Sequence, residues 1–137
     1  DLCLRICGDK TPNSYRVFHS FSTAYAKEFN EKNLNDDRVY YQSYAFVMKT
    51  PFSDMLMFVP RLVVGIVEGK NDGLLTPQAV QWGEFQGVHT GVGNRGISHC
   101  DEVDLRRRRF SKKQGEGISD ITEFYKEVVN KLKEKGY

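Results

Sequence analysis

The sequence has little cysteine and no CxxC pair. Its three cysteines are an odd number, Cys3, Cys7 and Cys100. This excludes a framework in which every cysteine forms a disulfide, and the spacing does not support a zinc knuckle. We therefore predict free thiols. Cys3 and Cys7 could still join if the chain turns sharply between them, because along an extended strand they would lie too far apart.

The sequence also has little excess of one charge over the other. It contains 20 Lys and Arg and 18 Asp and Glu, which gives a formal net charge of +2. So small an excess does not predict binding to nucleic acid or to an anionic membrane. The arginine run of residues 106–109 follows the acidic residues Asp101, Glu102 and Asp104. We expect local salt bridges there rather than a nucleic-acid interface, which needs a broader basic face.

Long apolar runs are absent as well. No run approaches the roughly 20 residues that a membrane-spanning helix needs. The N-terminus "DLCLRICGDK" lacks the basic region and long apolar region of a signal peptide. The sequence thus has no predicted transmembrane segment and no visible targeting signal. Because it begins with Asp1 rather than Met, we expect a processed product or a piece of a longer protein.

What the sequence does contain is an alternation of helical and extended patterns. Ser20 or Ser22 caps a stretch with apolar residues at helical spacing, which predicts a helix through Phe29. Residues 39–47 are rich in aromatic and branched side chains and predict a strand. The apolar run of residues 62–67 fits either a strand buried on both faces or part of a buried helix, since periodicity alone does not distinguish them.

Turns and short elements fill the space between these segments. Residues 49–54 and the glycine-rich residues 87–99 predict loops, the second of them a mobile loop or a hairpin. "GKNDG" predicts a turn, because Asn, Asp and Gly tolerate left-handed backbone. Thr76 and Pro77 predict the cap and first residue of a short helix.

The last predicted helix has the clearest signals. Asp120 is its cap, Glu123 completes a capping box, and the helix should end near Gly136. Its predicted apolar stripe consists of Ile121, Phe124, Val128, Val129 and Leu132.

These elements indicate an α/β layer arrangement within residues 1–137. A chain of this length has the usual size of one domain. Only two or three strands are convincing, however, which is too few for a complete doubly wound sheet. We therefore expect a single domain or a fragment with an incomplete sheet.

Asp72 and His99 are the residues whose chemistry suggests catalysis. A histidine has a pKa near neutrality and so serves as a general base, and a carboxylate at its other ring nitrogen fixes its tautomer. Asp72 lies in the "NDG" turn, and His99 follows a glycine-containing loop. The alternative is that Asp72 only shapes its turn and His99 bonds a backbone carbonyl.

The stretches "KNDGLLTPQAVQWGEFQG" and "RGISHCDEVDL" resemble the C-terminal part of bacterial triacylglycerol lipases of the α/β-hydrolase fold. In this family a motif like NDGLV carries the catalytic acid. A motif like HLDEV carries the catalytic histidine and, beyond it, a calcium-binding aspartate. "FSTAYAKEFNEKN" and "RVYYQSYAFV" are similar to further segments of the family, so the resemblance runs from about Phe21 to Leu105. It implies that residues 1–137 are the C-terminal part of an α/β-hydrolase, with few strands.

The resemblance gives the site residues their roles. It implies that Asp72 is the acid and His99 the base. It further implies a structural calcium ion held by the carboxylates of Asp54 and Asp101, whose hard oxygens suit calcium. Such an ion would tie the loop of Asp54 to the loop of His99.

The implied calcium site differs from that of the family in one detail, and one of its residues has an alternative role. The backbone carbonyls of Leu105 and Arg109 match further calcium ligands, although "LRRRR" differs from the family's usual sequence there. Asp54 could instead cap a helix that begins at Met55.

The family's nucleophile is missing from this sequence. These lipases carry a serine in a GxSxG turn that precedes the acid and the histidine. No serine here has the two flanking glycines: Ser14, Ser20, Ser22, Ser43, Ser53, Ser98, Ser111 and Ser119. We therefore expect the C-terminal part of a lipase or esterase that hydrolyses triacylglycerol-like or short-chain esters, with its serine upstream and no activity of this chain alone. The resemblance also implies secretion.

A rival hypothesis from another class is a non-catalytic, calcium-clamped binding or interaction domain derived from the hydrolase fold. Trp82 and the apolar residues 55–58 are relevant to packing under both hypotheses. Trp82 is predicted to lie in the core, and residues 55–58 either pack against the domain or face lipid.

Overall fold

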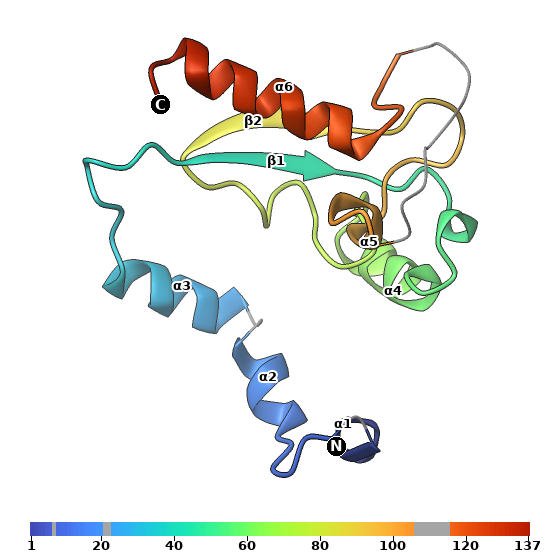
Figure 1. Ribbon diagram of the computed structural model, residues 1–137. Coiled ribbons are helices and arrows are strands. Elements are labelled where there is room, and N and C mark those ends of the chain that lie inside the picture. Colours follow the sequence, from blue (N-terminus) through green and yellow to red (C-terminus); the bar gives the residue numbers. More distant parts are fainter. Residues whose placement is uncertain (7, 21–22, 106–115) are drawn as a thin grey trace. The chain divides into compact units, whose positions relative to one another are not determined.

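The computed structural model describes every residue except 7, 21–22 and 106–115 (Figure 1). Two compact units make up the chain: an N-terminal unit, Asp1–Tyr40, and a C-terminal unit, Tyr41–Tyr137. Cys100 is a free, buried thiol, as predicted. The alternative pairing of the other two cysteines involves Cys7, which lies outside the described residues.

The N-terminal unit consists of three helices, α1 (Leu2–Ile6), α2 (Ser14–Ser20) and α3 (Thr23–Lys32). The predicted helix that follows Ser20 is confirmed as α3, although Ser22, one of its two predicted caps, lies outside the described residues. The ring of Phe29 is 52% exposed. The apolar face of α3 is therefore not part of a core.

The sheet of the C-terminal unit is a parallel pair of strands, β1 (Gln42–Phe46) and β2 (Glu84–His89). β1 confirms the strand expected within residues 39–47 and is shorter than predicted. β2 was not predicted: the sequence indicated a helix followed by a loop or hairpin there. Gly83 explains the difference, because its φ of 60° and its contact with the Tyr41 carbonyl, where a Cβ would lie 2.2 Å away, let the chain run beside β1.

The helix expected to begin at Pro77 is wrong, because only a turn forms there. Thr76 does cap this turn, since its hydroxyl and its carbonyl oxygen both accept from the Ala79 N–H, at 3.3 and 3.0 Å. The turn then gives way to β2. Trp82, at this junction, is 37% exposed, so its predicted core position is also wrong.

The apolar run of residues 62–67 is helical, within α4 (Phe58–Val67). Pro60 lies in the first turn of α4, where proline is tolerated, whereas proline disfavours a central strand. The run is not buried, however: Val63 is 56% and Ile66 is 85% exposed. The alternatives predicted for this run, a buried strand or a buried helix, therefore both overstate its burial in this chain.

The loop predicted for residues 49–54 contains a short 3-10 helix, η1 (Pro51–Ser53). In the segment between η1 and α4 the packing alternative holds in part, and the contact with lipid stays a prediction. Met57 is buried and joins a small cluster with Met48 and Cys100. Met55 and Leu56 are exposed.

The C-terminal helix α6 (Ile121–Glu134) covers one face of the sheet (Figure 1). Its predicted cap is confirmed, since Asp120 Oδ1 accepts from the Thr122 N–H at 2.9 Å. Glu123 bonds Lys126 Nζ at 2.6 Å. Four residues form the main core, with a T-shaped contact between two of the rings: Phe46, Ile97, Ile121 and Phe124. Val129, predicted in the same stripe, is half exposed.

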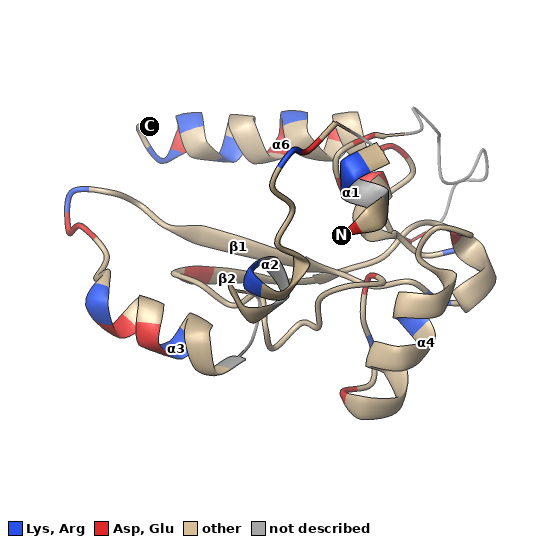
Figure 2. Cartoon of the chain, turned by 90° about the horizontal axis from the view of Figure 1, so that it is seen from below, with Lys and Arg blue, Asp and Glu red and all other residues tan. Residues whose placement is uncertain are grey.

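The described residues thus form helices and a small two-stranded parallel sheet, which is compatible with part of an α/β fold. Figure 2 shows basic and acidic residues interspersed along α3 and α6, whereas α4 contains Arg61 as its single charged residue. The arginine run of residues 106–109 lies outside the described residues. Of the helices described, none has the length and apolar character to cross a membrane.

Candidate functional site

Two segments far apart in the sequence are bound to the residues that follow β1. The Met48 N–H donates to the Asn71 carbonyl at 2.9 Å, and the Ile97 N–H donates to the Val47 carbonyl at 3.0 Å. The "NDG" turn and the short helix α5 (His99–Glu102) therefore meet at the carboxyl end of this strand. Functional sites of open α/β sheets lie at this edge.

Asp72 is held rigidly by its own turn. Its Oδ1 accepts from the N–H groups of Leu74 at 2.8 Å and Leu75 at 2.7 Å. Gly73 has a φ of 112°, and a Cβ there would lie 2.6 Å from the Met57 Cβ, so the turn needs glycine. With Oδ1 occupied, the second carboxylate oxygen of this buried residue is presented to the neighbouring segment.

His99 meets that oxygen. Its Nδ1 lies 2.8 Å from Asp72 Oδ2, and its backbone N–H donates to the Asp72 carbonyl, also at 2.8 Å. The histidine side chain is 38% exposed, and that of Asp72 is 4% exposed. The structure thus brings together the two residues proposed as acid and base, and leaves Nε2 as the nitrogen available for proton exchange. Asp72 also shapes its turn, through Oδ1, but this is not its only contact, as the alternative would require.

The charges of the pair reinforce each other. The hydrogen bond to Asp72 raises the pKa of His99 above its usual value, against an opposing effect of burial. For Asp72, burial favours the neutral acid, but hydrogen bonds from His99, Glu102 and the backbone outweigh it and lower its pKa. The pair therefore favours a charged carboxylate beside the imidazole, which is the electrostatic arrangement that stabilises an imidazolium.

Glu102 is a third titratable group at this site that the sequence did not single out. Its Oε2 lies 3.8 Å from His99 Nδ1, and its carboxyl group is hydrogen-bonded to that of Asp72. Burial, followed by the contact with Asp72, raises the pKa of Glu102 to about 9. A pKa this high favours the neutral acid at neutral pH. The available signal was its place three residues after the histidine, on the same side of a helix.

We predict that Glu102→Gln stabilises the protein at pH 8 but not at pH 4. Between the unfolded pKa of about 4.3 and the folded pKa of about 9, the native state binds the extra proton, so stability falls as pH rises. Glutamine does not titrate, so this loss of stability does not occur in the variant. We expect its free energy of unfolding at pH 8 to be about 1–3 kcal/mol higher than that of the wild type. Urea unfolding at both pH values measures it. Glu127→Gln, on the exposed side of α6, is the control, and an equal effect of Glu102→Gln at both pH values would contradict the prediction.

Asp54 and Asp101, the predicted calcium ligands, lie close together, joined through one hydroxyl group. Ser98 Oγ lies 2.7 Å from Asp54 Oδ2 and 2.9 Å from Asp101 Oδ2. Both carboxylates are buried. Asp54 does not cap a helix at Met55, since α4 begins only at Phe58. It shapes the preceding turn instead, through Oδ1, which accepts from the Leu56 N–H at 2.9 Å.

The donors around these carboxylates do not fit a calcium ion in this arrangement. Both oxygens of Asp101 accept from the Arg95 guanidinium, at 2.6 and 3.0 Å, so a positive charge already occupies its binding face. Calcium needs six to eight oxygen ligands. Of the implied backbone ligands, Arg109 lies outside the described residues. Calcium binding stays a prediction, and no step of a reaction is derived from it.

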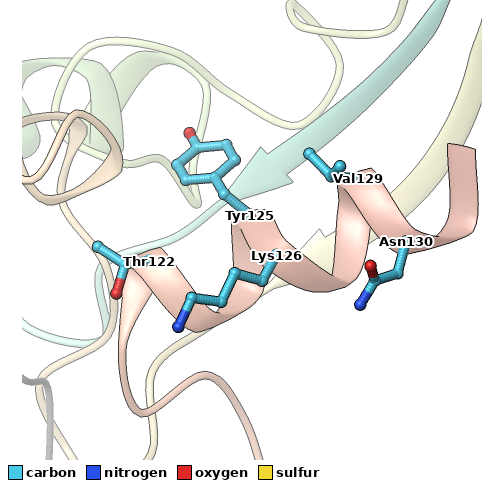
Figure 3. Close-up of a pocket in the computed structure, with 5 residues that line it drawn as sticks. All are labelled: Thr122, Tyr125, Lys126, Val129 and Asn130. Carbon is cyan, nitrogen blue, oxygen red and sulfur yellow. The ribbon is translucent and has the colours of Figure 1, made fainter. Parts of the chain in front are cut away.

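The serines near the pair are engaged elsewhere. Ser98 directs its hydroxyl into the Asp54 and Asp101 cluster, and Ser53 donates its hydroxyl to the Arg95 carbonyl. Neither is placed to act as a nucleophile toward His99. A shallow hollow on α6 is a separate feature, lined by Thr122, Tyr125, Lys126, Val129 and Asn130 (Figure 3). It has no paired acid and base.

Comparison with known proteins gives one relationship. The chain is 27% identical over 129 residues to triacylglycerol lipase 2 of Saccharomyces cerevisiae, an alignment that covers 88% of this chain and 38% of the relative. No family model matches the sequence, and no solved structure matches it. The chain thus spans about two-fifths of the length of a lipase to which its sequence is similar.

Proposed function

We propose that this chain is the acid-and-histidine part of a serine hydrolase that cleaves carboxylic esters of the triacylglycerol type. The observation that carries the proposal is the 2.8 Å contact between Asp72 Oδ2 and His99 Nδ1 at the end of a parallel strand. The nucleophilic serine comes from residues outside these 137. The yeast relative, whose name states a lipase activity, supports this class of substrate.

The chemistry follows from the two ring nitrogens of His99. As the serine oxygen attacks the ester carbonyl, Nε2 takes the hydroxyl proton and then passes it to the departing alcohol. In the second half-reaction a water molecule attacks the acyl group now bonded to the serine oxygen. Nε2 takes a proton from this water and passes it to the serine oxygen, which releases the carboxylic acid. Asp72 keeps Nδ1 protonated and stabilises the imidazolium that forms in each half of the reaction, which the raised pKa of His99 favours.

The exposed apolar surfaces of the chain are consistent with further protein around it. A parallel sheet is normally covered by helices on both faces and has more than two strands. Here α6 covers one face, while Val88 of β2 and five of the ten residues of α4 are exposed. An additional segment that adds strands and covers these residues would complete a hydrolase sheet and bring a serine to its edge.

The test compares the isolated chain with the complete gene product in which it occurs. We expect the complete protein to hydrolyse a short-chain nitrophenyl ester and to be inhibited by a fluorophosphonate that labels one serine outside residues 1–137. The isolated chain should show no hydrolysis above buffer. Hydrolysis by the isolated chain that is lost on His99→Ala would contradict the placement of the serine, and an inactive complete protein would contradict the proposed function.

A further inference from the structure

Each of the three guanidinium nitrogens of Arg95 donates a hydrogen bond to a segment of the candidate site. Nη1 and Nη2 donate to the two oxygens of Asp101, at 2.6 and 3.0 Å. Nε donates to the Ser53 carbonyl at 2.9 Å. The arginine side chain is 21% exposed and that of Asp101 is 2% exposed, so this pair is largely shielded from water.

The cluster around Arg95 needs a cation. Asp54 and Asp101 are 1% and 3% exposed and share the hydroxyl of Ser98, so two carboxylates are buried side by side. Two buried negative charges are unfavourable unless a positive charge and hydrogen bonds compensate them. A planar guanidinium that binds a carboxylate through two parallel bonds is the strongest side-chain partner for this purpose.

The same cluster fixes the start of α5, where His99 lies. Ser98 is the N-cap of α5, and Asp101 completes a capping box with it, in which Asp101 Oδ2 accepts from the Ser98 N–H at 2.9 Å. His99 and Cys100 lie between these two residues. At the other end of the network, the Arg95 carbonyl accepts from the Lys49 N–H at 3.1 Å, next to the strand end that also binds the "NDG" turn.

We propose that Arg95 supplies from the chain itself the positive charge that a divalent cation would otherwise provide at the N-terminus of α5, the helix that begins with His99. It compensates the charge of Asp101, which completes the capping box of α5, and so holds the start of this helix without bound metal. Its catalytic meaning rests on the proposed function, whereas its structural part does not.

The first test measures thermal unfolding of the chain with 5 mM calcium chloride or with 5 mM EDTA. We expect the two wild-type melting temperatures to agree, because the Arg95 guanidinium already provides the positive charge. Arg95→Ala should melt at least about 5 °C lower, since the buried carboxylate of Asp101 loses its charged partner beside a second buried carboxylate. Millimolar calcium or guanidinium should restore part of this loss, by occupying the vacated position. Arg95→Lys, which keeps the charge but not the paired bonds, should melt between the two without a response to calcium.

Arg38→Ala is the matched control, because Arg38 also binds one aspartate through two bonds, to Asp36 Oδ1 at 2.9 Å and Oδ2 at 2.6 Å, but in an exposed position. It should leave the melting temperature nearly unchanged. A wild-type protein stabilised by calcium would overturn the proposal, as would an Arg95→Ala melting temperature equal to that of Arg38→Ala or a failure of both cations to rescue it. If Arg95→Ala does not fold, Arg95→Lys and the wild-type calcium response decide the matter. These results do not depend on ester hydrolysis, so they separate this inference from the proposed function.

Discussion

Asp72→Asn should lower kcat for ester hydrolysis by the complete protein about 10⁴-fold. Asparagine keeps the shape of the side chain, and its Oδ1 can still accept from the Leu74 and Leu75 N–H groups that form the turn. What it removes is the negative charge 2.8 Å from His99 Nδ1. Without that charge the ring is free to take the wrong tautomer and its imidazolium is no longer stabilised. Steady-state kinetics with a nitrophenyl ester measure the loss.

Two controls make this prediction specific. Asp36→Asn removes a carboxylate that pairs with Arg38 on the surface, and kcat should stay at the wild-type value. Because Glu102 Oε2 lies 3.8 Å from the same ring nitrogen, the comparison is repeated in a Glu102→Gln background, where no second carboxylate remains. A loss of less than tenfold in that background, with the protein folded, would mean that Asp72 is not the orienting acid.

Elements that carry their own local signals were predictable from the sequence. Asp120 caps α6 as predicted, by a bond from the Thr122 N–H, and the predicted end near Gly136 agrees with a helix that ends at Glu134. In contrast, β2 depends on a partner strand remote in the sequence. Its start is set by the close approach of Gly83 to Tyr41, which no local pattern around residues 84–89 reveals. The exposed side of α4 was equally unpredictable, because an apolar run normally indicates burial.

The residues of the candidate site also differ in how far the sequence predicted them. Asp72 and His99 were identified from short motifs, and they meet because both segments bond the residues after β1. Glu102 and Arg95 were not identified, since their importance arises from contacts with buried carboxylates rather than from their neighbours in the chain. The pairing of Arg95 with Asp101 also changes what the predicted calcium ligands do in this structure. Similarity to a family motif indicates which residue types a site contains. Whether the site binds a cation also depends on the charges of the neighbouring side chains, which the motif does not include.

His99→Ala, measured in the complete protein, tests the central claim most directly. The side chain is the single proposed base, so its loss should lower kcat for ester hydrolysis by about 10⁴-fold or more, while the protein stays folded. The control is His19→Ala, in helix α2 of the N-terminal unit, which should retain full activity. If His99→Ala instead keeps activity within tenfold of the wild type, Asp72 and His99 are a structural pair, and the hydrolase proposal for this site is wrong.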